Sequence, residues 1–181
     1  LSDFTHQFFE GQWKLDDIPE GYYTEKNGIK LMVSGKIHQA NEGCACAMGT
    51  VMKQFVSSLA LEENQIAILD MEAGIEHFGR GLDDEVDVIL MVCDPSYESV
   101  QLAEKIRELG EKLQKPVYYV LNKTDEISRG VMTQAIRNPE RILAVLPAAP
   151  ELTAAALLGQ KLVLESSVLD QAAKKICGMQ A

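Results

Sequence analysis

Residues 65–70 read QIAILD and residues 87–93 read DVILMVC. Almost every position in these two runs is apolar, which is typical of strands in a parallel sheet that is covered on both faces. We therefore predict that both runs are central strands of an α/β sheet.

The segments around these runs alternate between short strands and amphipathic helices. Apolar residues recur at helical spacing from Met48 to Leu59 and again between Ser96 and Lys115. Further strands are predicted at Ile29–Ser34, Pro116–Leu121 and Arg141–Leu146, and closing helices at Glu151–Leu158 and Ser166–Cys177. Strands that alternate with helices favour a doubly wound, mostly parallel sheet. Residues 1–181 are predicted to form a single domain.

The charge balance restricts the class of partner. The chain has 27 acidic and 17 basic residues and a formal net charge of -10. Such a surface repels polyanions, so we expect neither nucleic acid nor an acidic membrane surface as a partner. No apolar run approaches the ~18 residues that a membrane-spanning helix needs, and the first residues lack the pattern of a secretory signal. A cytoplasmic protein is therefore predicted.

The first unusual strand end is Asp70-Met71-Glu72-Ala73-Gly74, directly after the run at 65–70. Ligands of α/β sheets bind at the carboxyl ends of the strands. Asp70 can hold Mg²⁺ there through water, and Gly74 lets a backbone N–H approach a γ-phosphate. The alternative is an ordinary turn, because Asp and Gly are common turn residues.

The second unusual strand end is Asn122-Lys123-Thr124-Asp125, which follows the strand ending at Leu121 and matches the N-K-x-D pattern of GTP-binding proteins. Asp125 can accept hydrogen bonds from the N1 and N2 donors of guanine, Asn122 can bond the ring edge, and Lys123 can lie along the base. The alternative is a charged turn that begins a helix. Residues 146–149 read LPAA instead of the Ser-Ala-Lys-like segment usual in guanine sites, so the choice of purine stays open.

The third candidate is the Cys44-Ala45-Cys46 pair just before an amphipathic helix. Two thiols one residue apart can face one metal ion, and a helix N-terminus favours the thiolate form. Because structural zinc and thiolate-bound nickel are commonly four-coordinate, two chains that each donate one pair would complete a site. This arithmetic predicts a homodimer. The alternative is a pair of buried or idle cysteines.

These features together resemble one family. The C-x-C pair, the segment DMEAGIEHFGRG at 70–81 and the strand followed by Asp94-Pro95-Ser96 are similar to the CooC-type nickel-insertion accessory ATPases of carbon monoxide dehydrogenase. That family is related to the Min- and Par-type ATPases, which have a deviant P-loop. The resemblance covers most of the chain, from Asp17 to about Leu162.

The resemblance implies a doubly wound P-loop NTPase sheet, ATP bound between two subunits, and Ni²⁺ or Zn²⁺ held by two C-x-C pairs on the dimer axis. Cys44 and Cys46 would be the metal ligands, Asp70 the acid associated with Mg²⁺, and Gly74 the γ-phosphate sensor. Asn122 would recognise the base, and the loop at Pro147 would flank it. Carbon monoxide dehydrogenase would be the partner that receives nickel.

One departure from the family pattern concerns the phosphate loop. Family members begin with a loop of the form G-K-G-G-x-G-K-T, and no such segment occurs in these residues. We therefore expect an N-terminally truncated version of the fold, which on its own hydrolyses ATP poorly because no backbone cradle or lysine holds the phosphates.

Two other functions remain open from the sequence. One is a GTP-dependent nickel metallochaperone, which the N-K-x-D pattern favours. The other is a non-catalytic module for metal binding and dimerisation, which needs only the cysteine pair.

Overall fold

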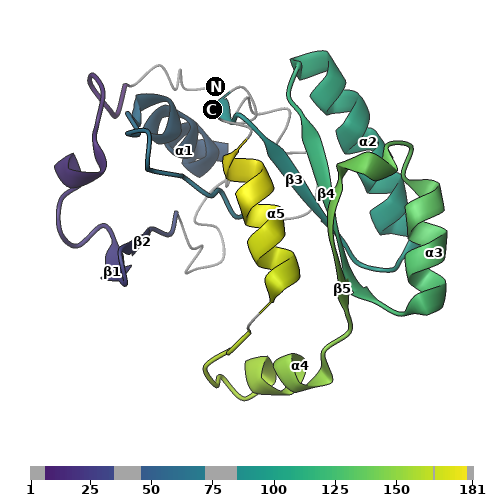
Figure 1. The fold of residues 1–181 in the computed structure, drawn as a ribbon. Coiled ribbons are helices and arrows are strands. Elements are labelled where there is room, and N and C mark those ends of the chain that lie inside the picture. The colour runs from purple at the N-terminus through teal and green to yellow at the C-terminus, as the bar shows by residue number, and fades with distance from the viewer. Residues whose placement is uncertain (1–6, 35–45, 72–84, 165, 179–181) are drawn as a thin grey trace. The chain divides into compact units, whose positions relative to one another are not determined.

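The structure is a computed structural model that describes residues 7–34, 46–71, 85–164 and 166–178. Its contacts group into two compact units, Leu1–Glu85 and Val86–Ala181, and each is considered by itself. Figure 1 shows the helices and strands of both units. None of the helices in the described segments combines the length and apolar character needed to cross a bilayer.

The second unit contains a three-stranded parallel sheet. Its strands are β3 (Ile89–Cys93), β4 (Val117–Thr124) and β5 (Ile142–Pro147), arranged in that order with β4 in the middle. Helix α2 (Tyr97–Leu113) connects β3 to β4. Helix α3 (Glu126–Ala135) and the short 3-10 helix Pro139–Arg141 connect β4 to β5. The predicted α/β class is confirmed, and three of the predicted strands form parallel pairs.

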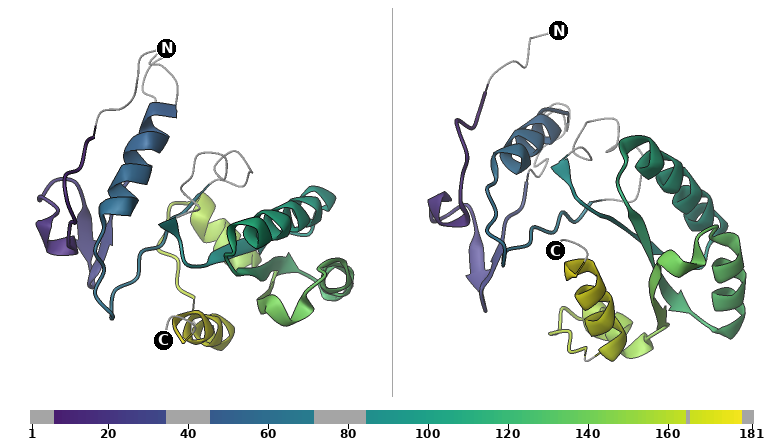
Figure 2. Two further views of the ribbon diagram at one scale, coloured as in Figure 1. Left: turned by 90° about the horizontal axis from the view of Figure 1, so that it is seen from above. Right: turned by 45° about the horizontal axis from the view of Figure 1, so that its top comes forward.

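Helices cover both faces of this sheet (Figures 1 and 2). Helix α2 contacts β3 and β4, and α3 contacts β4. On the other face, α5 (Ser167–Cys177) packs against β5. There Ala172 of α5 belongs to a buried apolar cluster with Val120, Leu143 and Ala144. Neighbouring residues of β4 alternate between the two faces, so this middle strand is buried on both sides.

Serine residues cap the N-termini of two helices of this unit, α2 and α5. Ser96 caps α2 by accepting a hydrogen bond from the backbone N–H of Ser99 at 3.1 Å. Ser166 caps α5 in the same way through Leu169. Such caps satisfy backbone donors that have no partner within the helix. Helix α4 (Pro150–Leu157) instead begins with a proline, which has no N–H to satisfy.

The first unit is built from a β-hairpin and helix α1 (Cys46–Ser58). Strands β1 (Thr24–Lys26) and β2 (Ile29–Leu31) pair antiparallel, after a short 3-10 helix at Leu15–Asp17. The turn between the strands is Asn27-Gly28, with φ of 53° and 77°. Positive φ at both positions is the geometry that Asn-Gly hairpin turns adopt. The predicted strand at 29–34 thus forms only over its first three residues, in a hairpin and not in the parallel sheet.

The predicted central strand at 65–70 is wrong. Gln65–Asp70 has no strand structure, and the side chains of Ile66 and Ile68 are 52% and 88% exposed. A strand needs a neighbour that satisfies its backbone N–H and C=O groups. No strand among residues 7–34, 46–71, 85–164 and 166–178 is hydrogen-bonded to this run.

The predicted strand at 87–93 forms as β3, but its central position is also corrected. Within the part of the chain that the structure describes, β3 pairs only with β4. It therefore lies at an edge of the described sheet, and Leu90 and Val92 are 43% and 53% exposed on one face. An apolar run predicts burial on two faces, but it does not determine how many strands the sheet supplies around it.

Candidate functional site

Polar residues gather where the three parallel strands end. β3 ends at Cys93 and is followed by Asp94, while β4 ends with Asn122, Lys123 and Thr124. The register pairs Cys93 with Leu121, so the residues that follow each of them are brought to the same edge of the sheet. This carboxyl edge is where α/β sheets bind ligands.

Asp94 is the centre of a hydrogen-bonded cluster at this edge. Its Oδ1 accepts a hydrogen bond from Nδ2 of Asn122 at 2.9 Å, and its Oδ2 accepts one from Nζ of Lys123 at 2.6 Å. These bonds stabilise the ionised carboxylate. The pKa of Asp94 is therefore below its ordinary value, with the Lys123 bond as the largest cause. In the sequence, Asp94 stands out only as a residue that follows a strand, and the cluster around it was not predicted.

We expect Lys123→Ala to raise the pKa of Asp94 toward the ordinary carboxyl value, because the largest cause of the depression is removed. A carboxyl group whose pKa is lower in the folded than in the unfolded chain stabilises the fold at pH values above its unfolded pKa. This stabilisation is lost as the pH falls through its folded pKa. Carboxyl-carbon NMR titration measures the shift. Lys112→Ala, a change at the end of α2, is the control and should leave Asp94 unaffected. An Asp94 pKa that does not move in Lys123→Ala would show that this ion pair is not formed in solution.

Asp125 has a different task in this structure: it caps α3. Its Oδ1 accepts hydrogen bonds from both the backbone N and Oγ of Ser128, each at 2.7 Å, and its own N–H donates to Ser128 Oγ at 2.8 Å. These bonds lower the pKa of Asp125. The residue therefore does what the charged-turn interpretation of the N-K-x-D segment predicts.

The ends of β4 and β5 are joined through Thr124. Its Oγ1 donates to the carbonyl oxygen of Leu146 at 3.0 Å, and its own carbonyl accepts from the N–H of Ala148 at 3.3 Å. Beside this junction lies an open depression of about 470 Å³. It is lined by Thr124, Asp125, Glu126, Arg129, Val145 and Pro147.

The structure thus brings four of the predicted residues to the carboxyl edge of the sheet, in two groups. Asp125 and Pro147 line the depression between the ends of β4 and β5. Asn122 and Lys123 bond to Asp94 at the end of β3. Both groups flank the end of the middle strand, which is a suitable position for a flat ligand with a polar edge.

The other predicted residues belong to the first unit. Asp70 is exposed and follows the irregular segment 65–69. Cys46 is the first residue of α1, whereas the sequence predicts the pair just before the helix. The side chain of Cys46 lies outside the described part, as do Cys44 and Gly74 entirely. Among the residues that are described, no three His, Cys, Asp or Glu side chains form a metal-binding group. That finding leaves the predicted cysteine site untested.

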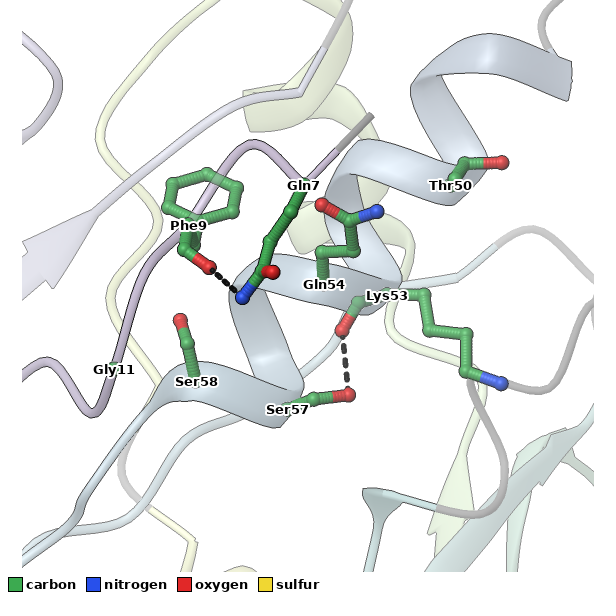
Figure 3. A pocket seen from close by; sticks show the side chains of 8 residues that line it. All are labelled: Gln7, Phe9, Gly11, Thr50, Lys53, Gln54, Ser57 and Ser58. Carbon is green, nitrogen blue, oxygen red and sulfur yellow. Dashed lines mark hydrogen bonds between the residues drawn. The ribbon is translucent and has the colours of Figure 1, made fainter. Parts of the chain in front are cut away.

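A second depression, of about 540 Å³, lies in the first unit between the segment after residue 6 and α1 (Figure 3). It is lined by Gln7, Phe9, Gly11, Thr50, Lys53, Gln54, Ser57 and Ser58. Several of its polar groups bond to nearby backbone: Gln7 Nε2 donates to the Phe9 carbonyl at 3.1 Å, and Ser57 Oγ to the Lys53 carbonyl at 2.9 Å. None of the predicted site residues lines it.

The chain is similar to several known proteins over most of its length. It is 44% identical over 161 residues to an uncharacterized ATP-binding protein of Methanocaldococcus jannaschii, which covers 89% of the chain and 64% of that relative. A second uncharacterized ATP-binding protein of the same organism is 31% identical over 166 residues, 90% of the chain and 63% of the relative. No protein-family model matches the chain.

A third relative has a more specific name. The carbon monoxide dehydrogenase accessory protein CooC of Rhodospirillum rubrum is 35% identical over 111 residues, which is 61% of the chain and 42% of CooC. The chain spans less than two thirds of the length of each of these relatives. The resemblance predicted from the sequence is confirmed as sequence similarity: the chain is similar to CooC and to proteins named as ATP-binding.

Proposed function

We propose that this chain forms part of a cytoplasmic, ATP-dependent maturation factor that delivers nickel to carbon monoxide dehydrogenase. The observation that carries the proposal is the 35% identity to the accessory protein CooC, together with the two more fully matched relatives that are named as ATP-binding proteins. In this proposal the residues at the strand ends bind the nucleotide, and the cysteine pair binds the metal ion.

In this proposal the nucleotide base lies at the carboxyl edge of the sheet. Asn122 contacts the base, and Pro147 and Asp125 form the wall of the depression beside it. Asp70 and Gly74 are assigned to Mg²⁺ and to the γ-phosphate, as the resemblance implies. Mg²⁺ would supply charge neutralisation on the phosphates.

Nickel is the cargo of the proposed factor. Cys44 and Cys46 supply two thiolates per chain, a donor type that suits Ni²⁺ or Zn²⁺, and a second copy of the chain supplies the other two. ATP binding would favour the closed homodimer and hydrolysis the open one, so a single closure equilibrium couples the nucleotide site to the metal site.

Replacing Cys44 and Cys46 together with serine should abolish stoichiometric metal binding, since serine hydroxyls are poor ligands for these ions. The native protein is expected to hold one nickel or zinc ion per two chains. Elemental analysis gives the metal content, and light scattering after size exclusion gives the number of chains. Cys177→Ser, which changes an exposed cysteine of α5, is the matched control and should keep the metal. Stoichiometric metal in the double variant would refute the cysteine site.

The N-K-x-D segment makes a GTP-dependent metallochaperone the second candidate, because Asn122 to Asp125 lie at the end of a parallel strand as in guanine sites. The capping role of Asp125 weighs against it. A non-catalytic metal-binding and dimerisation module is distinguished from both by calorimetry with Mg-ATP and Mg-GTP, since such a module would bind neither nucleotide.

A further inference from the structure

We propose that Asp94 selects adenine at this site by fixing the side-chain amide of Asn122 with its oxygen free to accept. The inference rests on the proposed function, in which a purine base lies at the carboxyl edge of the sheet. It adds a positioning residue, Asp94, that acts on the base through Asn122.

The orientation of the Asn122 amide follows from the chemistry of its partner. An ionised carboxylate only accepts hydrogen bonds, so the atom 2.9 Å from Asp94 Oδ1 is the NH₂ group, Nδ2. Turning the amide over would place its oxygen against the carboxylate. Lys123, at 2.6 Å from the other carboxylate oxygen, keeps Asp94 ionised and in place.

The amide oxygen of Asn122, Oδ1, is then available to a ligand. No donor in the described part of the chain reaches Oδ1 of Asn122, while Nδ2 is already engaged. The side chain is half-buried, and its bond to Asp94 is partly buried. A half-buried acceptor without a donor loses water contacts that a suitable ligand group can replace.

Purine bases differ at the position that such an acceptor would meet. Adenine carries an amino donor at its 6-position, whereas guanine and hypoxanthine carry an oxygen acceptor there. The free oxygen of Asn122 can accept from the amino group of adenine. The same oxygen would repel a 6-oxo group, because two acceptors would face each other.

Asp125 contributes to the same preference. In the guanine-binding arrangement its two carboxylate oxygens would accept from two neighbouring donors of the base. Here Oδ1 already receives two hydrogen bonds from Ser128, so the two carboxylate oxygens are not both available to the base. The two residues of the N-K-x-D segment that would recognise guanine are thus both committed to other partners within the fold.

Titration of the native chain with ATP and ITP tests the inference. Hypoxanthine has the 6-oxo group but no 2-amino group, so ITP isolates the 6-position from any contact between Asp125 and the 2-amino group of guanine. We expect ATP to bind at least about fivefold more tightly than ITP, the effect of one hydrogen bond. Amide NMR spectra of the 181-residue chain follow weak binding and also report whether each variant is folded.

In Asp94→Ala the amide of Asn122 can turn to suit either base, so the ratio of the two affinities should approach one. Glu98→Ala, in the first turn of α2, is the matched control: it also removes one negative charge but leaves the Asp94–Asn122 bond, and should keep the preference for ATP. A change in phosphate attraction would affect both nucleotides equally and leave the ratio unchanged.

The outcomes separate this inference from the proposed function. If native protein binds ATP and ITP equally, or if folded Asp94→Ala keeps the native ratio, Asp94 does not set the base preference, although the nucleotide site stands. If neither ATP nor ITP shifts any resonance of the native chain, the proposed nucleotide site fails and the inference fails with it. Should Asp94→Ala not fold, equal binding of ATP and ITP by the native chain would still refute the inference.

Discussion

Leu121→Ala is expected to lower the free energy of unfolding by about 3 kcal/mol, because it removes a large side chain from the centre of β4 and leaves a cavity. Leu121 is 0% exposed and lies in the middle strand, between Cys93 of β3 and Val145 of β5. For a chain of this size the loss corresponds to a fall in Tm of roughly 10 °C. Urea unfolding followed by far-ultraviolet circular dichroism measures it.

Leu157→Ala is the matched control for this substitution. Leu157 ends α4 and is 84% exposed, so the same change of side chain should alter the free energy of unfolding by no more than about 0.5 kcal/mol. Equal losses in the two variants would contradict the packing of β4 described above.

Gly110→Ala is expected to destabilise the protein by about 2 kcal/mol, although alanine is the better helix former. Gly110 is a buried residue in the last turn of α2, next to the first residue of β4. A Cβ atom there would come within 2.3 Å of Val117 Cγ2 and 3.0 Å of the Lys115 carbonyl oxygen. Val117 is only 1% exposed, so its side chain has little room to move away.

Gly130→Ala provides the opposite case within α3. No atom lies within 4 Å of a Cβ built at Gly130, so the intrinsic preference of alanine should stabilise the fold by about 1 kcal/mol. Thermal melts of both variants beside the native chain give the two signs. A stable Gly110→Ala protein would mean that α2 does not approach β4 as closely as the structure shows.

Local patterns predicted most elements of the second unit. The apolar residues of DVILMVC and the helical spacing after Ser96 place β3 and α2 correctly, and Ser96 caps that helix. These elements depend on residues close together in sequence, which is why periodicity finds them. The run at 65–70 has the same composition and forms no strand, because strand formation also needs a neighbour that local pattern does not reveal.

The hairpin of the first unit has a clear signal in the sequence, the turn residues between its strands. Asn27-Gly28 is a strong two-residue turn sequence, and β1 and β2 flank it directly. The short strands carry little apolar pattern of their own, so the turn residues were the better evidence.

The candidate site was predicted in part. The position of Asn122 and Asp125 at a strand end follows from the sequence, but the role of Asp94 does not. Asp94 and Asn122 are 28 residues apart and meet only because β3 and β4 pair in a particular register. The capping bonds of Asp125 are local, and the Ser three residues later was their signal.

The bonds that Thr124 makes to Leu146 and Ala148 have a consequence for the energetics of ligand capture. They hold the ends of β4 and β5 together in the absence of a ligand, so the surface between these ends is preorganised. Ligand binding at this surface should therefore cost the protein chain little conformational entropy. The residence time of the ligand should depend on its direct contacts with this surface and not on the closing of a loop.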